Sequence, residues 1–159
     1  MLRLAMVALV VAAPLFAQKF AFTIGNTVAA QDFRAKAAAF VFRTEGCADP
    51  AKAQISGTAE GLLKGTRKSL PIQVVAMTQP GVYAVNQGWP AEGDWVVNLK
   101  GTCASANAGE SKAPRLDVAG ALVPIGPKGF IRESSKFFSR PATDAEIEAS
   151  LKALTGGKK

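Results

Sequence analysis

Apolar and polar residues alternate with a period of two along most of the chain after residue 18. The pattern is clearest in five segments, KFAFTIG (19–25), AAAFVFRTEGC (37–47), GVYAVNQ (81–87), DWVVNLKGTC (94–103) and RLDVAGALVPIG (115–126). Because successive side chains of a strand point to opposite faces of a sheet, each segment predicts a β-strand. Segment 37–47 is especially rich in apolar residues, which predicts a central strand buried on both faces for part of its length.

Weaker strand signals lie between these segments. AQISGTAEG (53–61) predicts a strand with a bulge at Gly57, and the basic stretch that follows it predicts a solvated loop. In the next apolar stretch Pro71 belongs at a strand start or at a sheet edge, because proline has no N–H to donate. Strand signals recur about every 10–15 residues with turn residues between them, which indicates an all-β sandwich rather than βαβ units.

The C-terminal segment changes character. The stretch 126–141 is ambiguous between strand and loop, and TDAE (143–146) then has the spacing of a helix capping box. Three apolar residues follow at helical spacing, Ile147, Leu151 and Leu154. We predict a helix over about 144–154 that ends at Gly156-Gly157 and either docks on the sandwich or forms a frayed tail.

The first 17 residues have the layout of a secretory signal peptide. Arg3 precedes an apolar run that Pro14 ends, and Ala17 offers a small residue for cleavage, with Ala30 as the second candidate. The run is too short to be a stable anchor, so no transmembrane segment is expected after cleavage. The expected domains are therefore a signal peptide (1–17), a β-sandwich (18–141) and a helix with a tail (142–159), in the periplasm or outside the cell.

The chain has two cysteines, Cys47 and Cys103. In an oxidising compartment an even pair far apart in sequence is most simply a structural disulfide, here between the two sheets of the sandwich. The alternative is a redox pair, but redox pairs usually have the C-x-x-C spacing that is absent here.

The stretch 81–103 holds the single tyrosine, both tryptophans and Cys103. In the strand 94–103 the alternating positions Trp95, Val97, Leu99 and Cys103 fall on one face. We expect this face to form the core, with the Trp95 indole buried beside the disulfide.

The order G-x-Y at Gly81 and Tyr83, followed by G-x-W at Gly93 and Trp95 with alternating apolar residues after it, resembles exported immunoglobulin-like sandwiches. The YtkA-like and FixH-like bacterial domains are similar in this respect, over about residues 37–103. The resemblance implies an immunoglobulin-like antiparallel β-sandwich. It does not imply copper binding here, because the ligands that some such domains use are absent.

The residue types present exclude several kinds of chemistry. There is no histidine, so a Ser-His-Asp or Cys-His arrangement cannot form and the commonest metal ligand is missing. Bridged cysteines offer no thiolate, so neither a metal nor a cofactor is expected. Glu92 and Asp94 lie close in sequence but lack a calcium-loop pattern. A small hydrolase using paired acids such as Glu92, Asp94 and Asp117 stays open as an alternative to a non-catalytic protein.

The leading hypothesis is an exported, non-catalytic binding or accessory protein whose partner is a protein or another envelope component. Function on such scaffolds lies on loops, and the candidate binding residues are Asn86, Gln87, Trp89 and Glu92 in one loop and Lys64, Arg67 and Lys68 in another. Trp89 is either an exposed anchor or a ring folded over the core edge.

The net charge of +7 motivates an alternative, a basic surface that binds anionic envelope lipid or polysaccharide. The lysines and arginines are scattered, so no nucleic-acid partner is expected.

Overall fold

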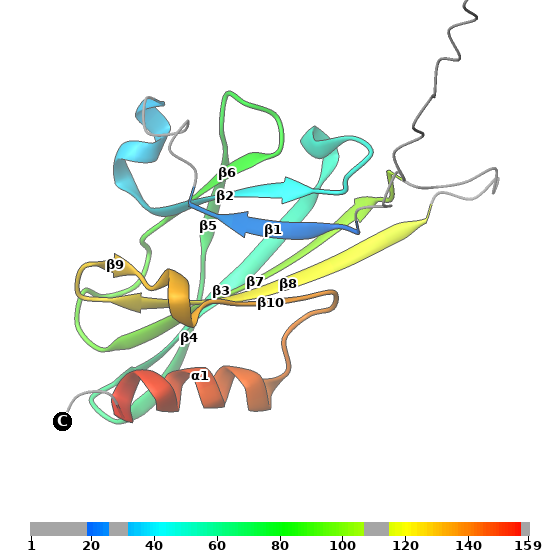
Figure 1. Cartoon of the computed structure of the whole chain (residues 1–159). Helices are drawn as coiled ribbons and strands as arrows, with labels where there is room; N and C mark the ends of the chain where they lie inside the picture. Colours follow the sequence, from blue (N-terminus) through cyan, green and yellow to red (C-terminus); the bar gives the residue numbers. More distant parts are fainter. Residues whose placement is uncertain (1–18, 26–31, 107–114, 157–159) are drawn as a thin grey trace, which may run out of the picture.

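The computed structural model describes residues 19–25, 32–106 and 115–156 (Figure 1). The predicted signal peptide and both predicted cleavage sites lie outside the described residues. The strands are β1 (Ala21–Ile24), β2 (Ala38–Glu45), β3 (Gln54–Leu63), β4 (Thr66–Pro71), β5 (Gln73–Ala76), β6 (Val82–Asn86), β7 (Asp94–Ala104), β8 (Leu116–Gly126), β9 (Gly129–Phe130) and β10 (Lys136–Phe138). Short 3-10 turns are η2 (Phe33–Ala37), η3 (Pro50–Lys52) and η4 (Arg132–Ser134), and the helix is α1 (Asp144–Gly156).

The strands form two antiparallel sheets. One has the order β1-β2-β6-β5, and the other has the order β10-β8-β7-β3-β4, with β9 paired to β8. The strand order β1-β2-β6-β5 on one sheet and β3-β7-β8 on the other matches the two sheets of an immunoglobulin sandwich. The all-β, immunoglobulin-like prediction is therefore confirmed, and the strands predicted at 19–25, 37–47, 81–87, 94–103 and 115–126 are all present.

The chain passes between the sheets at Ile72, the single residue that separates β4 from β5. Pro71 ends β4, which is the edge strand of the larger sheet, as predicted for a residue without a backbone donor. The expected bulge at Gly57 is wrong, because β3 pairs with β7 in continuous register. Gly57 instead leaves room for the partner strand, since a Cβ there would lie 2.1 Å from the Asn98 carbonyl oxygen.

The basic stretch after β3 is exposed to solvent, as predicted, but it forms a tight hairpin rather than a loop. β3 and β4 pair up to Leu63 and Thr66, and two residues, Lys64 and Gly65, make the turn. Both have positive φ, 51° and 78°. That combination is typical of the two-residue turns whose twist matches antiparallel strands.

Aromatic rings fill the space between the sheets. Phe42 stacks on Tyr83 with ring centroids 5.4 Å apart, and Phe22 meets Phe42 edge to face at the same distance. The inward positions Phe40, Phe42 and Thr44 of β2 are buried, whereas the residues between them are partly exposed. The prediction that β2 is buried on both faces for part of its length is met only in part. On the outer face Val41 packs half-buried against Met77, Val82 and Ala84, and no β2 residue on that face is fully buried.

Helix α1 covers the outer face of the larger sheet (Figure 1). Ile147 and Leu151 pack on Val96 of β7 and Leu122 of β8, so the helix is docked rather than frayed. The capping box is confirmed, because the Glu146 carboxylate accepts from the Thr143 backbone N–H at 2.8 Å and the Glu146 N–H donates to the Thr143 hydroxyl at 3.4 Å.

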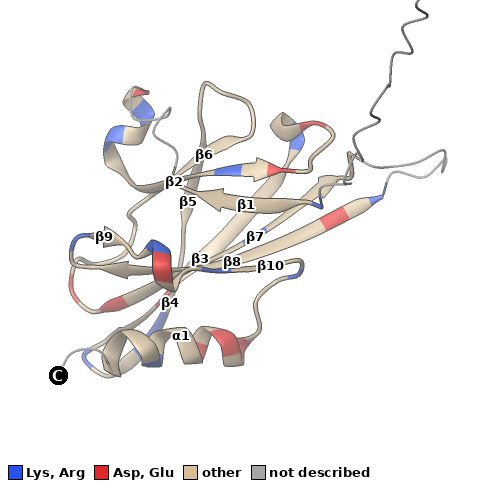
Figure 2. Ribbon diagram, in the orientation of Figure 1, with Lys and Arg blue, Asp and Glu red and all other residues tan. Residues whose placement is uncertain are grey.

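A salt bridge extends the capping box. The Arg140 guanidinium donates to both carboxylate oxygens of Glu146, at 2.8 and 2.9 Å. Hydrogen bonds from Arg140 and then from the Thr143 backbone lower the pKa of Glu146 to about 2. Figure 2 shows the acidic residues at the start of α1, where carboxylates interact favourably with the helix dipole.

The predicted disulfide joins Cys47, which follows β2, to Cys103 in β7, and so links the two sheets. Trp95, Val97, Leu99 and Cys103 all belong to the core between the sheets, as expected. The expectation that Trp95 lies beside the disulfide is wrong. Trp95 is close to the start of β7 and Cys103 close to its end, a separation of about 26 Å along an extended strand. The tryptophan and the disulfide therefore stabilise opposite ends of the sandwich.

Candidate functional site

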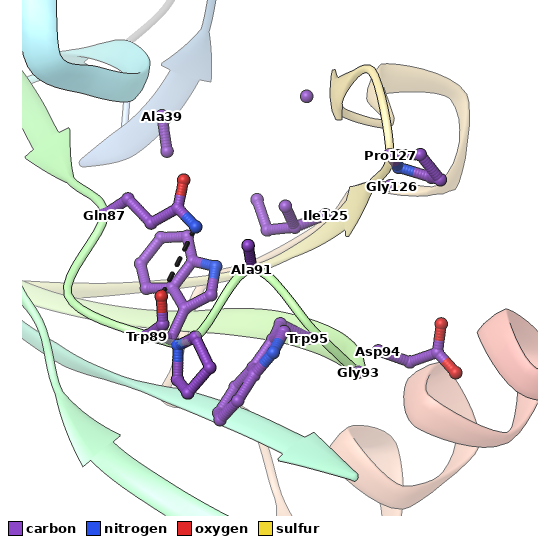
Figure 3. A pocket seen from close by; sticks show the side chains of 12 residues that line it. Ala39, Gln87, Trp89, Ala91, Gly93, Asp94, Trp95, Ile125, Gly126 and Pro127 are labelled. Carbon is purple, nitrogen blue, oxygen red and sulfur yellow. Dashed lines mark hydrogen bonds between the residues drawn. The ribbon is translucent and has the colours of Figure 1, made fainter. Parts of the chain in front are cut away.

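A pocket of about 420 Å³ lies at the tryptophan end of the sandwich, between the β6–β7 loop and the β8–β9 turn (Figure 3). Twelve residues line it, namely Ala39, Gln87, Trp89, Pro90, Ala91, Gly93, Asp94, Trp95, Ile125, Gly126, Pro127 and Gly129. We call it the tryptophan pocket. A cleft of this size is within the range that binds small molecules or the side chains of a partner.

Both indoles of the tryptophan pocket are held in fixed positions. Trp95 is 2% exposed and Trp89 is 5% exposed. The Trp95 Nε1–H donates to the Glu92 carbonyl at 2.8 Å, and the Gln87 side-chain amide donates to the Trp89 carbonyl at 3.3 Å. Of the two alternatives for Trp89, the ring folded over the core edge is confirmed and the exposed anchor is wrong. Its indole forms a wall of the pocket instead.

A glycine opposite Trp95 makes room for this arrangement. Gly61 of β3 pairs with Trp95, and a Cβ on Gly61 would lie 2.3 Å from the indole ring. The ring therefore lies flat over β3, and any larger residue at position 61 would displace it. At the other side of the indole, Gly93 has φ 93°, a conformation that favours glycine, and it turns the loop into β7.

Most residues that line the tryptophan pocket are apolar or glycine, and polar atoms share the lining surface with apolar ones. Figure 3 shows Ala91 and Ile125 beside the Trp89 indole, whereas the Asp94 carboxylate is directed away from that ring. Gln87 contributes a side-chain amide to the lining, and Asp94 is the one charged residue among the lining residues of the described chain. Such a lining suits an uncharged group with an apolar part.

Two of the four residues predicted for this loop line the pocket, and two do not. Gln87 and Trp89 contribute to it, whereas Asn86 lies in β6, where its Nδ2 donates to the Gln73 side chain at 3.2 Å. The Glu92 side chain is exposed outside the lining, and its backbone carbonyl holds Trp95. Ile125, Gly126 and Pro127 were not predicted, because neither the strand pattern of 115–126 nor the ambiguous stretch 126–141 indicates that this turn meets the β6–β7 loop.

The three predicted basic residues do not form one patch. Arg67 points toward α1, where its guanidinium pairs with Glu148 and lies 3.5 Å from Glu60. Lys68 follows Arg67 in β4 and pairs in register with Gly61, so its side chain points to the face of the sheet opposite to that of Arg67. Lys64 lies in the turn between β3 and β4. Figure 2 shows lysines and arginines spread over several strands and loops rather than collected on one face.

The partner of Arg67 is a buried carboxylate. Glu60 is 6% exposed, and its Oε1 accepts from the Thr58 hydroxyl at 2.6 Å and from the Ser69 hydroxyl at 2.7 Å. Because a buried charge is stable only when paired and hydrogen-bonded, this group ties β3, β4 and α1 together. We assign it a structural role, and the sequence offered no signal for it.

The acidic residues considered for catalysis are divided between the two ends of the sandwich. Asp94 begins β7, and Asp117 pairs in register with Cys103 near the other end of the same strand. Asp94 and Asp117 therefore do not form an acid pair. Within residues 19–25, 32–106 and 115–156, no cluster of three or more histidine, cysteine, aspartate or glutamate side chains could hold a metal ion.

None of the helices in the described part of the chain is long and apolar enough to cross a membrane. Comparison with known proteins found no matching family model, no matching curated protein and no matching solved structure.

Proposed function

We propose that this chain is an exported, non-catalytic binding module, and that it binds its partner at the tryptophan pocket. One observation carries the proposal. The pocket has about 420 Å³ of space, and both of its indole walls are already in place: the Trp95 indole donates to the Glu92 carbonyl, and the Trp89 ring is buried. A preformed site loses little conformational entropy when a partner binds, so little of the binding free energy is spent on ordering it.

The disulfide supports export to the periplasm or the medium. Cys47 and Cys103 are bridged, and stable structural disulfides belong to oxidising compartments. An immunoglobulin-like sandwich with loops gathered at its two ends is a common architecture for extracytoplasmic recognition.

The pocket lining defines the chemistry of the partner. Ala39, Ala91 and Ile125 with the indoles favour an aliphatic or proline-like group, and Gln87 can exchange one or two hydrogen bonds with a backbone amide. A protein segment that inserts an apolar side chain satisfies both conditions. The alternative of an anionic lipid or polysaccharide has less support, because the lining has no lysine or arginine and the basic hairpin is divided between two faces.

Blocking the pocket without disturbing the core tests the proposal. Ala91 is exposed and lines the pocket, so Ala91→Arg should fill the space while leaving the fold intact. Ala51→Arg, at an exposed position in η3 near the disulfide end, is the matched control. We expect the parent and Ala51→Arg to capture the same partner from solubilised cell envelope, and Ala91→Arg to lose it by at least about tenfold, since a filled hot-spot pocket costs more than about 1.4 kcal/mol. Equal capture by both variants would contradict the proposal.

A further inference from the structure

A second cavity, separate from the tryptophan pocket, lies where α1 meets η4 and β10. It has a volume of about 230 Å³ and is lined by Pro124, Ser134, Lys136, Ser150, Ala153 and Leu154. We call it the helix groove. At about 30 Å³ for each water-sized group, it has room for on the order of eight non-hydrogen atoms. A small ligand therefore fits, whereas a folded domain does not.

A buried hydroxyl in the helix groove lacks a partner. Ser150 is 3% exposed, and within the described residues its Oγ makes no hydrogen bond. A serine inside a helix commonly donates to the carbonyl one turn earlier, but the Ser150 hydroxyl has no such bond here. The Ser150 Oγ has almost no accessible surface, so a ligand atom reaches it only when the side chain turns toward the groove. Because leaving a buried polar group unpaired is unfavourable, that pairing would remove an existing penalty. A hydrogen bond to Ser150 would therefore contribute favourably to the free energy of ligand binding.

The other lining groups divide into a polar side and an apolar side. Lys136 is exposed and contributes an ammonium group, and Ser134 contributes a second hydroxyl. Pro124, Ala153 and Leu154 form the apolar side. The lining residues include no carboxylate, and the nearest acidic residue in sequence, Glu133, is not among them. A positive charge and two hydroxyls opposite an apolar wall complement an anion with a short hydrocarbon portion.

We propose that the helix groove binds a small aliphatic carboxylate, with the carboxylate at Lys136 and Ser150 and the hydrocarbon against Leu154. Two sources share this chemistry, a free short-chain fatty acid and the C-terminal carboxylate of a peptide that ends in an aliphatic residue. This site does not depend on the partner site at the tryptophan pocket.

The test uses the full chain and hexanoate, followed by NMR chemical-shift titration, with hexanol and hexylamine as matched neutral and cationic probes. Hexanoate should bind saturably and the other two should not. Lys136→Gln should weaken hexanoate binding about tenfold or more, because it removes a charge-assisted hydrogen bond. Lys152→Gln changes an exposed lysine of α1 that is not in the lining, and it should bind like the parent. Absence of saturable binding, or equal losses in the two lysine variants, would overturn the proposal.

Ser150→Ala separates a ligand site from a merely structural serine. Removing an unpaired buried hydroxyl should raise the thermal midpoint, while the loss of a ligand hydrogen bond should weaken hexanoate binding about fivefold. Unchanged affinity in Ser150→Ala would overturn the proposal. An acetylated dipeptide ending in leucine, compared with its C-terminal amide, distinguishes the two sources. If the free acid binds and the amide does not, the groove also accepts the C-terminal carboxylate of a peptide. If neither dipeptide binds, the ligand class is the free fatty acid.

Both tryptophans of the chain line the other pocket. Tryptophan fluorescence therefore reports that pocket during the same titration, and it should stay constant as hexanoate is added. A fluorescence change with the same midpoint as the chemical shifts would place hexanoate at the tryptophan pocket and overturn the assignment to the helix groove.

Discussion

Trp95→Ala is expected to lower the free energy of unfolding by about 3–5 kcal/mol, as large aromatic truncations in a core do. The indole is 2% exposed and lies over Gly61, where no side chain could fill the space it would vacate. The substitution also removes the donor to the Glu92 carbonyl, so the β6–β7 loop loses the bond that fixes it to β7. The variant should therefore lose both stability and the shape of the tryptophan pocket.

Urea unfolding followed by far-UV circular dichroism measures this loss without depending on the deleted fluorophore. Trp95→Phe is the matched control, because it retains most of the ring volume and removes the N–H. Its loss should be clearly smaller than that of Trp95→Ala. If the free energy of unfolding of Trp95→Ala is within about 1 kcal/mol of the parent's, the effect is no larger than that of an ordinary substitution. Trp95 would then not anchor this end of the sandwich.

Replacement of both cysteines by serine, Cys47→Ser with Cys103→Ser, is expected to lower the free energy of unfolding by about 4 kcal/mol. The bridge closes a loop of 56 positions, and the chain-entropy model assigns about this value to a loop of that length. Cys103 is 3% exposed, so a serine hydroxyl there adds a smaller penalty in the same direction.

The stabilities of the parent and the double variant should be compared with and without a reductant. Reductant should bring the parent close to the double variant and should leave the variant itself unchanged. The contrary result is a parent whose thiols are shown by mass to be free after reduction and that still unfolds at the same urea concentration in both conditions. The disulfide would then not stabilise the fold.

Local patterns were sufficient to predict most of the elements. Alternation located β2, β6, β7 and β8, because the period of two arises within each strand. The Thr143–Glu146 spacing located the start of α1, because a capping box is formed by residues three apart. The pairing of Cys47 with Cys103 needed only their number and the inference of export.

Features that depend on position along a strand could not be predicted in this way. Alternation places Trp95 and Cys103 on one face of β7, but eight residues of extended strand separate them by about 26 Å, so the expected contact between them was wrong. Arg67 and Lys68 are neighbours in sequence, yet neighbouring strand residues point to opposite faces, so the basic cluster is divided.

The candidate site shows the same limit. Gln87 and Trp89 were identified from their loop, but Ile125 and Pro127 join them only through the pairing of β7 with β8. Glu60 could not be identified either, because its partners Arg67 and Ser69 come from another strand, β4, and Arg67 in turn pairs with Glu148 of α1. In each case the missing information is tertiary, and a single sequence does not contain it in any local pattern.

The central claim is that a partner binds at the tryptophan pocket, and site-specific photo-crosslinking in intact cells tests it most directly. A benzophenone side chain would replace Ala91 in one form of the full chain and Ala51 in another, both at exposed positions and at opposite ends of the sandwich. The account predicts a discrete crosslinked product of defined mass from position 91 and none from position 51. No product from position 91, or the same product from both positions, would contradict it.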